Sequence, residues 1–473
     1  MDSRNGTAAP TLLEIAGIMG GRLHVPVPAL RDSRITGVCS DTRRILEGNL
    51  FVAISGERYD GHDFVPEAVR SGAQASLVTA DWHDGRPDWD SPDGARIVVP
   101  EVLPALQAFA GWHRNRFDLP VIAVTGSNGK TTTKNMIASV LSERYRVFKT
   151  PGNLNSQLGV SETLFSLEED HGAAVLELGM NRAGELSRLA RMTRPSVGVI
   201  TNVGPAHIEF FESIEGIARA KGEILDHLPE DGNAVLNADD PLVMKQAGRS
   251  RAQVITFGRG AGSDVRLVRT TTELSGSVFT LSDGAVFRTN LTGEHQVMNA
   301  VAAVAVGRLF GIDDNSIARA LQCVGPTPMR MEYRKMGAVH LIDDTYNANP
   351  SSMKAALDAL AATAGRKLVV LGDMLELGET GRAAHREIGK HAAGVAERIV
   401  TVGNLARDIA EAAVDEGMPA SRVVACSSND EAAASALAEI RDGDVILVKG
   451  SRGMRMETIV ESMAEALCRP VKG

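Results

Sequence analysis

The sequence predicts an α/β protein of three domains: a small α/β N-terminal domain, a central domain built on a parallel sheet, and a Rossmann-like C-terminal domain. Three observations support this prediction. The 473 residues suit about three domains of roughly 100–200 residues each. Short apolar runs alternate with helical patterns in two separate regions, as in sheets covered by helices on both faces. Prolines lie between these regions, at Pro120 and at Pro326 and Pro328.

The N-terminal domain is expected at residues 1–117. A compact α/β stretch ends in ASLVTA, and a segment rich in Asp, Gly and Pro follows at residues 81–96, which we expect to be a surface loop. The run IVVP and a helix around Leu103–Phe117 then lead to Leu119 and Pro120. We place the first boundary there.

The central domain is expected at residues 118–325. The apolar runs VIAVTG, AAVLELG, SVGVITNV, NAVLNA and QVITFG alternate with helical patterns and predict a parallel sheet. Residues 263–292 instead alternate polar and apolar residues between turn signals, which predicts antiparallel hairpins attached to this domain. A helix beginning at Asn299 is expected to follow.

The C-terminal domain is expected at residues 326–473. Five apolar runs alternate with helical patterns there: VHLID, KLVVLGD, RIVTVG, RVVAC and DVILVKG. This repetition is typical of a Rossmann-like sheet.

Composition excludes several classes of protein. Hydrophobic residues make up 44% and charged residues 23%, as in ordinary globular proteins, and the net charge of −9 disfavours a broad basic surface for nucleic acid. The four scattered cysteines form no CxxC pair, which predicts free thiols in a reducing compartment. The N-terminus lacks an apolar signal-peptide core, and no run of about 18 apolar residues occurs. We therefore expect a cytoplasmic protein without a membrane span.

A glycine-rich turn follows the first strand of the central domain. VIAVTGSNGKTTTKNMIASVL predicts a strand, a turn and a helix whose backbone N–H groups can bind phosphate. Lys130 can neutralise a β- or γ-phosphate and Thr131 can ligate Mg²⁺. The general P-loop pattern requires glycine where Val124 stands, so this is a shortened form. A chance glycine-rich turn is the alternative, and the strand before and helix after it favour a P-loop-type, ATP-binding domain.

Two side chains follow later strands of the same predicted sheet. Glu177 ends the strand AAVLELG, and ligands of open α/β sheets bind at the carboxyl ends of strands. A carboxylate there suits Mg²⁺, although an exposed glutamate at a strand end is an equally common outcome. His207 lies just past another strand, in TNVGPAHIEFF. A lone histidine is more often structural than a ligand, and only this location favours a role in the site.

Lys221 lies on the apolar stripe of a predicted helix. It is four residues from both Ile217 and Leu225, which belong to that stripe. Burial would lower the pKa of its amine, and a neutral amine can react with CO₂ to form a carbamate, an anionic metal ligand. The stripe alone favours the alternative, in which the amine extends to the surface at the edge of the stripe.

The stretch TGSNGKTTT resembles the signature loop of the Mur ligases and of their folylpolyglutamate synthetase relatives. Further stretches resemble the branch that adds D-alanyl-D-alanine: SDTRRILEGNLFVAISGERYDGHDF, TPGNLNSQLGV, LELGMNRAGEL, GPAHIEFFESIEGIARAKGEI, DDTYNANPSSMKAAL, LGDMLELG and VKGSRGMRME. The resemblance covers nearly the whole chain. The DNPR-type motif of the tripeptide-forming branch is absent from the sequence.

This resemblance implies an ATP-dependent ligase of peptidoglycan precursor synthesis that joins D-alanyl-D-alanine to UDP-N-acetylmuramoyl-tripeptide. It implies ATP and two Mg²⁺ ions as cofactors, N6-carboxylation of Lys221, and a monomer. The tripeptide carboxylate would attack the γ-phosphate of ATP, and the dipeptide amine would then attack the resulting acyl phosphate. Lys130, Glu177, His207 and Lys221 would be the catalytic residues.

The resemblance also implies the binding residues. The ATP-binding set would be Gly126, Ser127, Asn128, Gly129, Lys130, Thr131, Thr132, Asn299, Arg330 and Asp344. Thr131 and Glu177 would bind one Mg²⁺, and His207 with the carbamate of Lys221 would bind the second. The UDP end of the substrate would contact Ser40, Asp41, Thr42 and Arg43, and the muramoyl-peptide part would contact Asn153 and Asn155. The C-terminal domain would bring the dipeptide.

Two positions depart from the family pattern. GxHNxxNA is present as residues 293–300 with Gln296 in place of the first asparagine, and Met329 stands where the family often has a glycine before the arginine. We assign neither residue a role from sequence.

Three alternatives stay open at this point. A sister ligase would use a free amino acid or glutamate as acceptor. A P-loop switch or motor ATPase would hydrolyse ATP without a UDP-linked acceptor, and the shortened phosphate loop and the SDTR stretch disfavour it. A degenerate module without activity is disfavoured because all the expected phosphate-binding and metal-binding residues are present: Lys130, Thr131, Glu177, His207 and Lys221.

Overall fold

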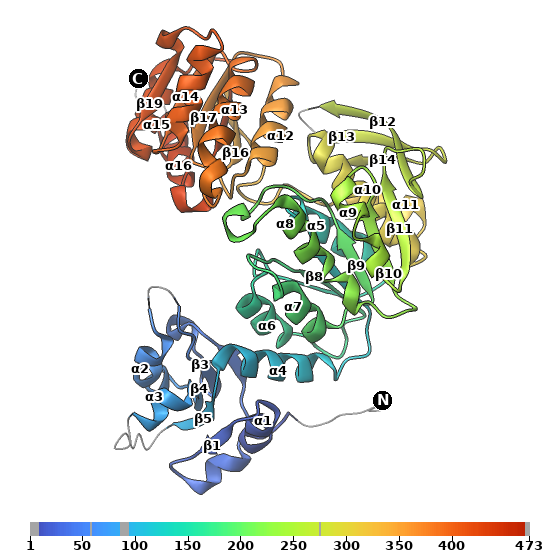
Figure 1. Ribbon diagram of the computed structural model, residues 1–473, viewed down its shortest axis with the longest axis vertical. Coiled ribbons are helices and arrows are strands. Elements are labelled where there is room, and N and C mark those ends of the chain that lie inside the picture. Colours follow the sequence, from blue (N-terminus) through green and yellow to red (C-terminus); the bar gives the residue numbers. More distant parts are fainter. Residues whose placement is uncertain (1–8, 57–58, 86–93, 274–275, 469–473) are drawn as a thin grey trace.

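The computed structural model describes residues 9–56, 59–85, 94–273 and 276–468. Three sheets follow one another along the chain, and the three domains lie in a row along the long axis of the molecule (Figure 1). The predicted fold class is confirmed. The residue limits proposed for the domains stay predictions. No described helix has the length and apolar character that a membrane crossing requires.

The N-terminal domain contains a five-stranded sheet in the order β1-β5-β4-β3-β2, in which β1 is antiparallel and the other neighbours are parallel. The strands are β1 (Arg22–His24), β2 (Gly37–Cys39), β3 (Asn49–Val52), β4 (Ala75–Thr79) and β5 (Ala95–Val99). The helices are α1 (Leu12–Ile18), α2 (Val65–Arg70), α3 (Ala80–Asp84) and α4 (Val102–Arg114). Helix α4 also contacts the central domain, where Phe109 and Phe165 have ring centroids 4.8 Å apart.

The loop predicted at residues 81–96 is partly wrong. Helix α3 occupies its start because the Thr79 side chain accepts a hydrogen bond from Trp82 N and caps the helix, and β5 begins at Ala95. Residues 86–93 lie outside the described residues.

The central domain contains a nine-stranded sheet in the order β14-β13-β12-β11-β10-β9-β6-β8-β7. The strands are β6 (Val121–Thr125), β7 (Val147–Lys149), β8 (Ala173–Glu177), β9 (Val197–Ile200), β10 (Asn233–Asn237), β11 (Gln253–Gly258), β12 (Val265–Glu273), β13 (Gly276–Leu281) and β14 (Val286–Thr289). Strands β6 to β12 form parallel pairs, and β12, β13 and β14 form the predicted antiparallel hairpins.

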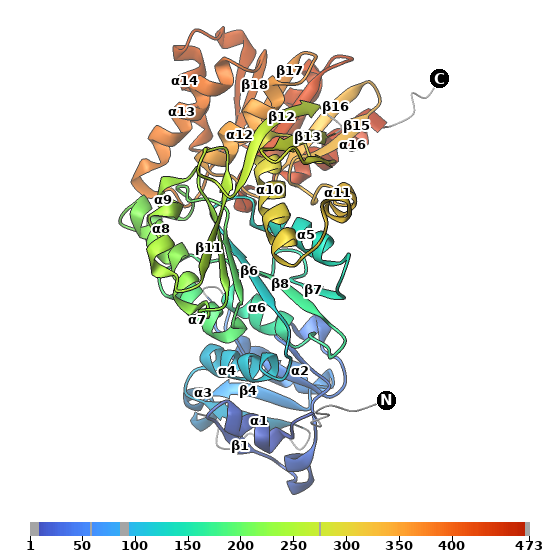
Figure 2. The same cartoon turned by 90° about the vertical axis from the view of Figure 1, so that its right-hand side faces the viewer.

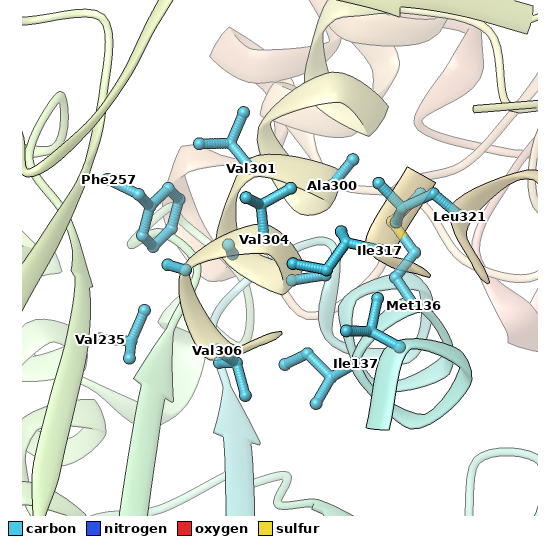
Figure 3. Close-up of a cluster of buried hydrophobic side chains, with 14 of the residues drawn as sticks. Met136, Ile137, Val235, Phe257, Ala300, Val301, Val304, Val306, Ile317 and Leu321 are labelled. Carbon is cyan, nitrogen blue, oxygen red and sulfur yellow. The ribbon is translucent and has the colours of Figure 1, made fainter. Parts of the chain in front are cut away.

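Helices cover both faces of this sheet. They are α5 (Lys130–Leu141), α6 (Gln157–Leu164), α7 (Glu185–Thr193), α8 (Ile214–Gly222), α9 (Pro241–Met244), α10 (Glu294–Leu309) and α11 (Asp314–Gln322). Alternate residues of β6 point to opposite faces, so Ile122 belongs to one core cluster and Ala123 to the other. Figure 3 shows the first cluster, where side chains of α5, α10 and α11 meet Val235 and Phe257 of the sheet.

Helix α10 begins at Glu294, five residues before the predicted start at Asn299. Gly293 has a φ of 110°, a conformation that β-carbon-bearing residues rarely adopt, and the helix starts directly after it. The helix therefore places Gln296 on its first turn, beside the phosphate loop.

The C-terminal domain contains a six-stranded sheet in the order β15-β16-β20-β17-β18-β19, antiparallel only between β15 and β16. The strands are β15 (Glu332–Met336), β16 (Val339–Asp344), β17 (Lys367–Gly372), β18 (Arg398–Val402), β19 (Val423–Cys426) and β20 (Val445–Lys449). The helices are α12 (Pro350–Ala361), α13 (Gly381–Ala393), α14 (Ala406–Asp415), α15 (Asn429–Glu439) and α16 (Glu457–Cys468). Cores lie on both faces of this sheet too.

The order of the central strands positions the site. Strand β6 lies between β8 and β9. After β6 the chain continues to β7 and β8 on one side of β6 (Figure 2), and it then crosses to β9 on the other side. Ligands of open α/β sheets bind at such a switch point, beyond the carboxyl ends of the strands.

The cysteines are in accord with the sequence: Cys39, Cys323 and Cys426 are free, while the side chain of Cys468 lies outside the described residues.

Candidate active site

A cavity of about 440 Å³ lies between the central and C-terminal domains. Most of the predicted site residues line it: the phosphate loop from Gly126 to Thr132, Asn155, Glu177, His207, Lys221, Asn299, Arg330 and Asp344. The structure thus brings together residues that are more than 200 positions apart in the sequence.

The phosphate loop requires its two glycines. Gly126 has a φ of 149° and Gly129 a φ of 80°, and a β-carbon would lie 1.9 Å from Thr201 Oγ1 at the first and 2.4 Å from Asn299 Oδ1 at the second. Helix α5 begins at Lys130 without a side-chain cap, so its first N–H groups are available to an anion. This local geometry matches the predicted phosphate cradle.

Hydrogen bonds from two neighbouring elements fix the loop. Asn128 N donates to Asn202 Oδ1 (2.9 Å), and Thr201 Oγ1 donates to Asn128 O (2.6 Å). Asn349 Nδ2, from the C-terminal domain, donates to Asn128 Oδ1 (2.9 Å). The amine of Lys130 donates to Gly126 O (2.8 Å), and burial lowers the pKa of Lys130. The loop is therefore held in one shape from both domains.

Glu177 and Thr131 have buried oxygens that lack hydrogen-bond partners. Glu177 is fully buried, and its Oε1 accepts a hydrogen bond from Asn155 Nδ2 (2.7 Å). Its Oε2 and Thr131 Oγ1 have no hydrogen-bond partner among the described residues. Such atoms are costly to bury, and a hard cation with oxygen ligands such as Mg²⁺ would satisfy both. The side chains present therefore fit the predicted metal.

Lys134 is a charged residue of the site that sequence reasoning missed. Its Nζ donates to Thr150 O and Gly152 O (2.8 Å each) and lies 3.6 Å from Glu177 Oε2. It follows Lys130 by four residues and so lies on the same side of α5, which is the signal that could have indicated it. Lys134 partly offsets the charge of Glu177 and fixes the turn that precedes Asn155.

Lys221 is buried, with 3% of its surface exposed, at the end of α8. The alternative of an amine at the surface is therefore wrong: Lys221, like Ile217, is a buried residue of α8, and it lines the cavity. No described residue forms a hydrogen bond or ion pair with its amine. Burial and the nearby charge of Lys130 hold the pKa of Lys221 well below its usual value. A neutral, nucleophilic amine is the form that reacts with CO₂.

His207 lies in the loop after β9, with a φ of 59°. Its Nδ1 is 2.5 Å from Oε2 of Glu376, a residue of the C-terminal domain, and this hydrogen bond lowers the pKa of the Glu376 carboxyl. Within the described part of the chain, its Nε2 has no protein partner. His207 therefore has one nitrogen free for a ligand.

The residues predicted on the nucleotide side form a second group. Asn299 Nδ2 donates to Gln296 Oε1 (3.0 Å), so Gln296, the departure from the family pattern, supports Asn299. The guanidinium carbon of Arg330 lies 3.9 Å from the ring centroid of Tyr346, a cation–π contact. Asp344 pairs with the buried Lys449 (2.6 Å). Met329 has a φ of 60°, a left-handed conformation that favours glycine, which is the residue that the resemblance led us to expect there.

The residues predicted to contact the UDP part lie elsewhere. Ser40, Asp41, Thr42 and Arg43 follow β2 in the N-terminal domain and do not line the cavity. Ser40 N donates to Glu162 Oε1 of the central domain (2.9 Å), and a hydrogen bond from Arg43 lowers the pKa of Asp41 to about 2. Asn153 also lies outside the cavity lining, hydrogen-bonded to Tyr346.

Three family models match the chain: the Mur ligase family, catalytic domain, at residues 34–113; the Mur ligase middle domain at residues 124–307; and the Mur ligase, glutamate ligase domain, at residues 329–452.

Two curated relatives are named UDP-N-acetylmuramoyl-tripeptide–D-alanyl-D-alanine ligase. The protein from Bacillus subtilis (strain 168) is 38% identical over 461 residues, covering 96% of this chain and 98% of its own. The protein from Escherichia coli (strain K12) is 35% identical over 470 residues, with the same coverage of 96% and 98%.

Two solved structures are also similar. MurF from Acinetobacter baumannii has a TM-score of 0.86 and 33% identity, covering 97% of this chain and 99% of its own. MurF ligase from Thermotoga maritima in complex with ADP has a TM-score of 0.79 and 30% identity, covering 91% and 97%.

Proposed function

The chain belongs to the Mur ligase family, and we propose that it is the ATP-dependent ligase that joins D-alanyl-D-alanine to UDP-N-acetylmuramoyl-tripeptide in peptidoglycan precursor synthesis. Relatives with this name align over nearly the whole chain, and one similar structure holds ADP. The observation that carries the proposal is the cavity in which a glycine phosphate loop, the buried Glu177 and the buried Lys221 meet residues of the C-terminal domain. An enzyme that only hydrolyses ATP does not require residues of a second domain in its site.

The reaction has two steps in this proposal. A carboxylate oxygen of the tripeptide attacks the γ-phosphorus of ATP, the bond to the β–γ bridging oxygen breaks, and ADP and an acyl phosphate result. The free amine of D-alanyl-D-alanine then attacks the acyl carbon and loses a proton, and inorganic phosphate leaves. The product is UDP-N-acetylmuramoyl-pentapeptide.

The main difficulty is electrostatic, because a carboxylate must approach a triphosphate. The N–H groups at the start of α5 and the amine of Lys130 are positioned to bind the phosphates. Thr131 and Glu177 would hold one Mg²⁺, and His207 with an N6-carboxylated Lys221 a second, and these ions would screen the negative charges.

The C-terminal domain would complete the site. Asn299, Arg330 and Asp344 would hold the adenine or ribose, with Tyr346 packed on Arg330. The hydrogen bond from Asn349 to Asn128 joins this domain to the phosphate loop. Closure in this manner keeps water from the acyl phosphate. Asn155 and Asn153 would contact the muramoyl-peptide, Ser40 to Arg43 the UDP end, and the C-terminal domain would bring the dipeptide.

The deciding experiment measures phosphate release with ATP, Mg²⁺ and UDP-N-acetylmuramoyl-tripeptide, with and without D-alanyl-D-alanine. We expect release that depends on both acceptors, and a pentapeptide product by mass. Release with a free amino acid in place of the dipeptide would reassign the chain to a sister ligase, and release without any acceptor would support an ATPase. We further expect a monomer in the cytoplasm.

A further inference from the structure

The segment that holds His207 is packed between two domains. Ile208, the next residue and the first of a short 3₁₀ helix (Ile208–Phe210), contacts both the core of the central domain and a core of the C-terminal domain. His207 itself lines the main cavity together with Glu177 and Lys221, and it also lines a smaller cavity formed mainly by the C-terminal domain. Its surroundings therefore depend on where the C-terminal domain lies.

Residues on both sides of Glu376 are anchored in the C-terminal domain. After β17, Met374 N donates to Nε2 of the buried His385 (2.9 Å), and Leu375 N donates to Ser451 Oγ (2.9 Å). Leu377, on the other side of Glu376, is 3% exposed in the domain core. Glu376 has a φ of 61°, so its backbone is held in a left-handed conformation between these anchors. These contacts thus attach the backbone at Glu376 to the C-terminal domain.

The two segments meet at several atoms. His207 Nδ1 and Glu376 Oε2 are 2.5 Å apart, and Glu209 N donates to Glu376 O (3.4 Å). A β-carbon at Gly378 would lie 3.4 Å from Cβ of Glu209, so the backbones approach closely. A carboxylate at Nδ1 fixes the tautomer with the proton on Nδ1, and the lone pair of Nε2 is then available to a metal.

From these contacts we propose that Glu376 is a positioning residue, by which closure of the C-terminal domain fixes the tautomer and orientation of His207 for metal binding. The proposal rests on the proposed function, in which His207 is a ligand of the second Mg²⁺. In this proposal His207 is oriented for metal binding only when the C-terminal domain is closed. The metal site is then complete only when the acyl phosphate is shielded from water.

The competing explanation is an ordinary ion pair between domains. The side chains of His207 and Glu376 are 24% and 46% exposed. Exposed pairs of this kind contribute about 0–1 kcal/mol. Such a pair would affect closure alone, whereas a positioning residue acts on the metal through His207. The two explanations therefore differ in the measured affinity for metal.

The experiment uses the full chain and Mn²⁺ as the probe. Mn²⁺ binding is followed by electron paramagnetic resonance with a non-hydrolysable ATP analogue and UDP-N-acetylmuramoyl-tripeptide present, for the wild type, Glu376→Ala and Glu376→Gln. Glu379→Ala is the matched control, because Glu379 is exposed in the same loop. Loss of a carboxylate that orients a metal-bound histidine typically lowers metal affinity or activity by about 10–100-fold.

We expect Glu376→Ala to weaken one of two Mn²⁺ sites and to lower kcat by at least about tenfold, with little change in the KM for ATP. Glu376→Gln should lose less, because its amide oxygen can still accept the proton of Nδ1. Glu379→Ala should match the wild type. Unchanged Mn²⁺ affinity in Glu376→Ala would overturn the proposal.

A double-variant cycle tests whether Glu376 acts through His207. In a His207→Ala background, Glu376→Ala should cause no further loss of Mn²⁺ affinity, whereas additive losses would overturn the proposal. The proposal would also be overturned if His207→Ala weakened neither Mn²⁺ site relative to the wild type. Because binding is measured without turnover, a wild type that binds two Mn²⁺ ions but makes no pentapeptide would contradict the proposed function alone.

Discussion

The burial of Lys221 predicts that function at this position is gained at the expense of stability. Its side chain is 3% exposed, and its amine lines the cavity without a hydrogen-bond or ion-pair partner among the residues described. A polar group that is largely removed from water and has no protein partner costs up to about 1–3 kcal/mol. Lys221→Met removes that group at similar volume, so the variant should be more stable than the unmodified wild type by about 1–3 kcal/mol. It should also be nearly inactive in the phosphate-release assay.

The effect should depend on pH in a defined direction. The pKa of Lys221 is lower in the folded chain than its usual value near 10.5. Above pH 10.5 the amine of Lys221 is neutral in both the folded and the unfolded chain, so its protonation does not affect the free energy of unfolding. As the pH falls below about 10.4, the unfolded chain binds a proton first, so the free energy of unfolding of the wild type decreases. The advantage of the Met variant should therefore grow from pH 10 toward neutral pH.

The assay is urea unfolding in CO₂-depleted buffer, followed by fluorescence and circular dichroism across this pH range. Lys245→Met is the control, because Lys245 is exposed at the end of α9 and its loss should change stability by less than about 0.5 kcal/mol. Adding bicarbonate should reduce the difference in unfolding free energy between Lys221→Met and the wild type, since carbamate formation replaces the unpartnered amine of Lys221. A Lys221→Met variant less stable than the wild type without CO₂ would refute the reasoning.

Three further predictions follow from the site. Lys130→Ala should lower turnover at least about 100-fold in the phosphate-release assay, because charge stabilisation at the phosphates is lost, and near-normal ligation would contradict the phosphate-loop assignment. Gly129→Ala should raise the KM for ATP and destabilise the fold by about 1–2 kcal/mol in urea unfolding, since its φ is 80° and a β-carbon would meet Asn299. Met329→Gly should be neutral or stabilising by up to about 1 kcal/mol, whereas Met329→Val should destabilise, because φ is 60° there; equal urea midpoints for both variants would argue against strain.

Sequence reasoning located the strands and the phosphate loop because their signals are local. A strand followed by Gly126, Gly129 and a helix start is specified by a few consecutive residues, and the helix N-terminus binds anions whatever surrounds it. The start of α10 was displaced by five residues because Gly293, rather than the apolar pattern, ends the preceding segment. The loop at residues 81–96 was partly wrong because the capping hydrogen bond from Thr79 was overlooked.

The sequence by itself determined the fold class, the phosphate loop and the resemblance to one ligase branch, since these depend on short-range patterns and on residue identity. Only the tertiary structure decided which ionisable groups are buried and what they meet. The apolar stripe alone favoured an amine that extends to solvent, whereas packing around α8 buries the side chain of Lys221. Glu376 lies 169 residues from His207 in the chain, and their contact exists only because the C-terminal domain folds back onto the central one. Desolvation and long-range pairing depend on all neighbours in space, so no local pattern specifies them.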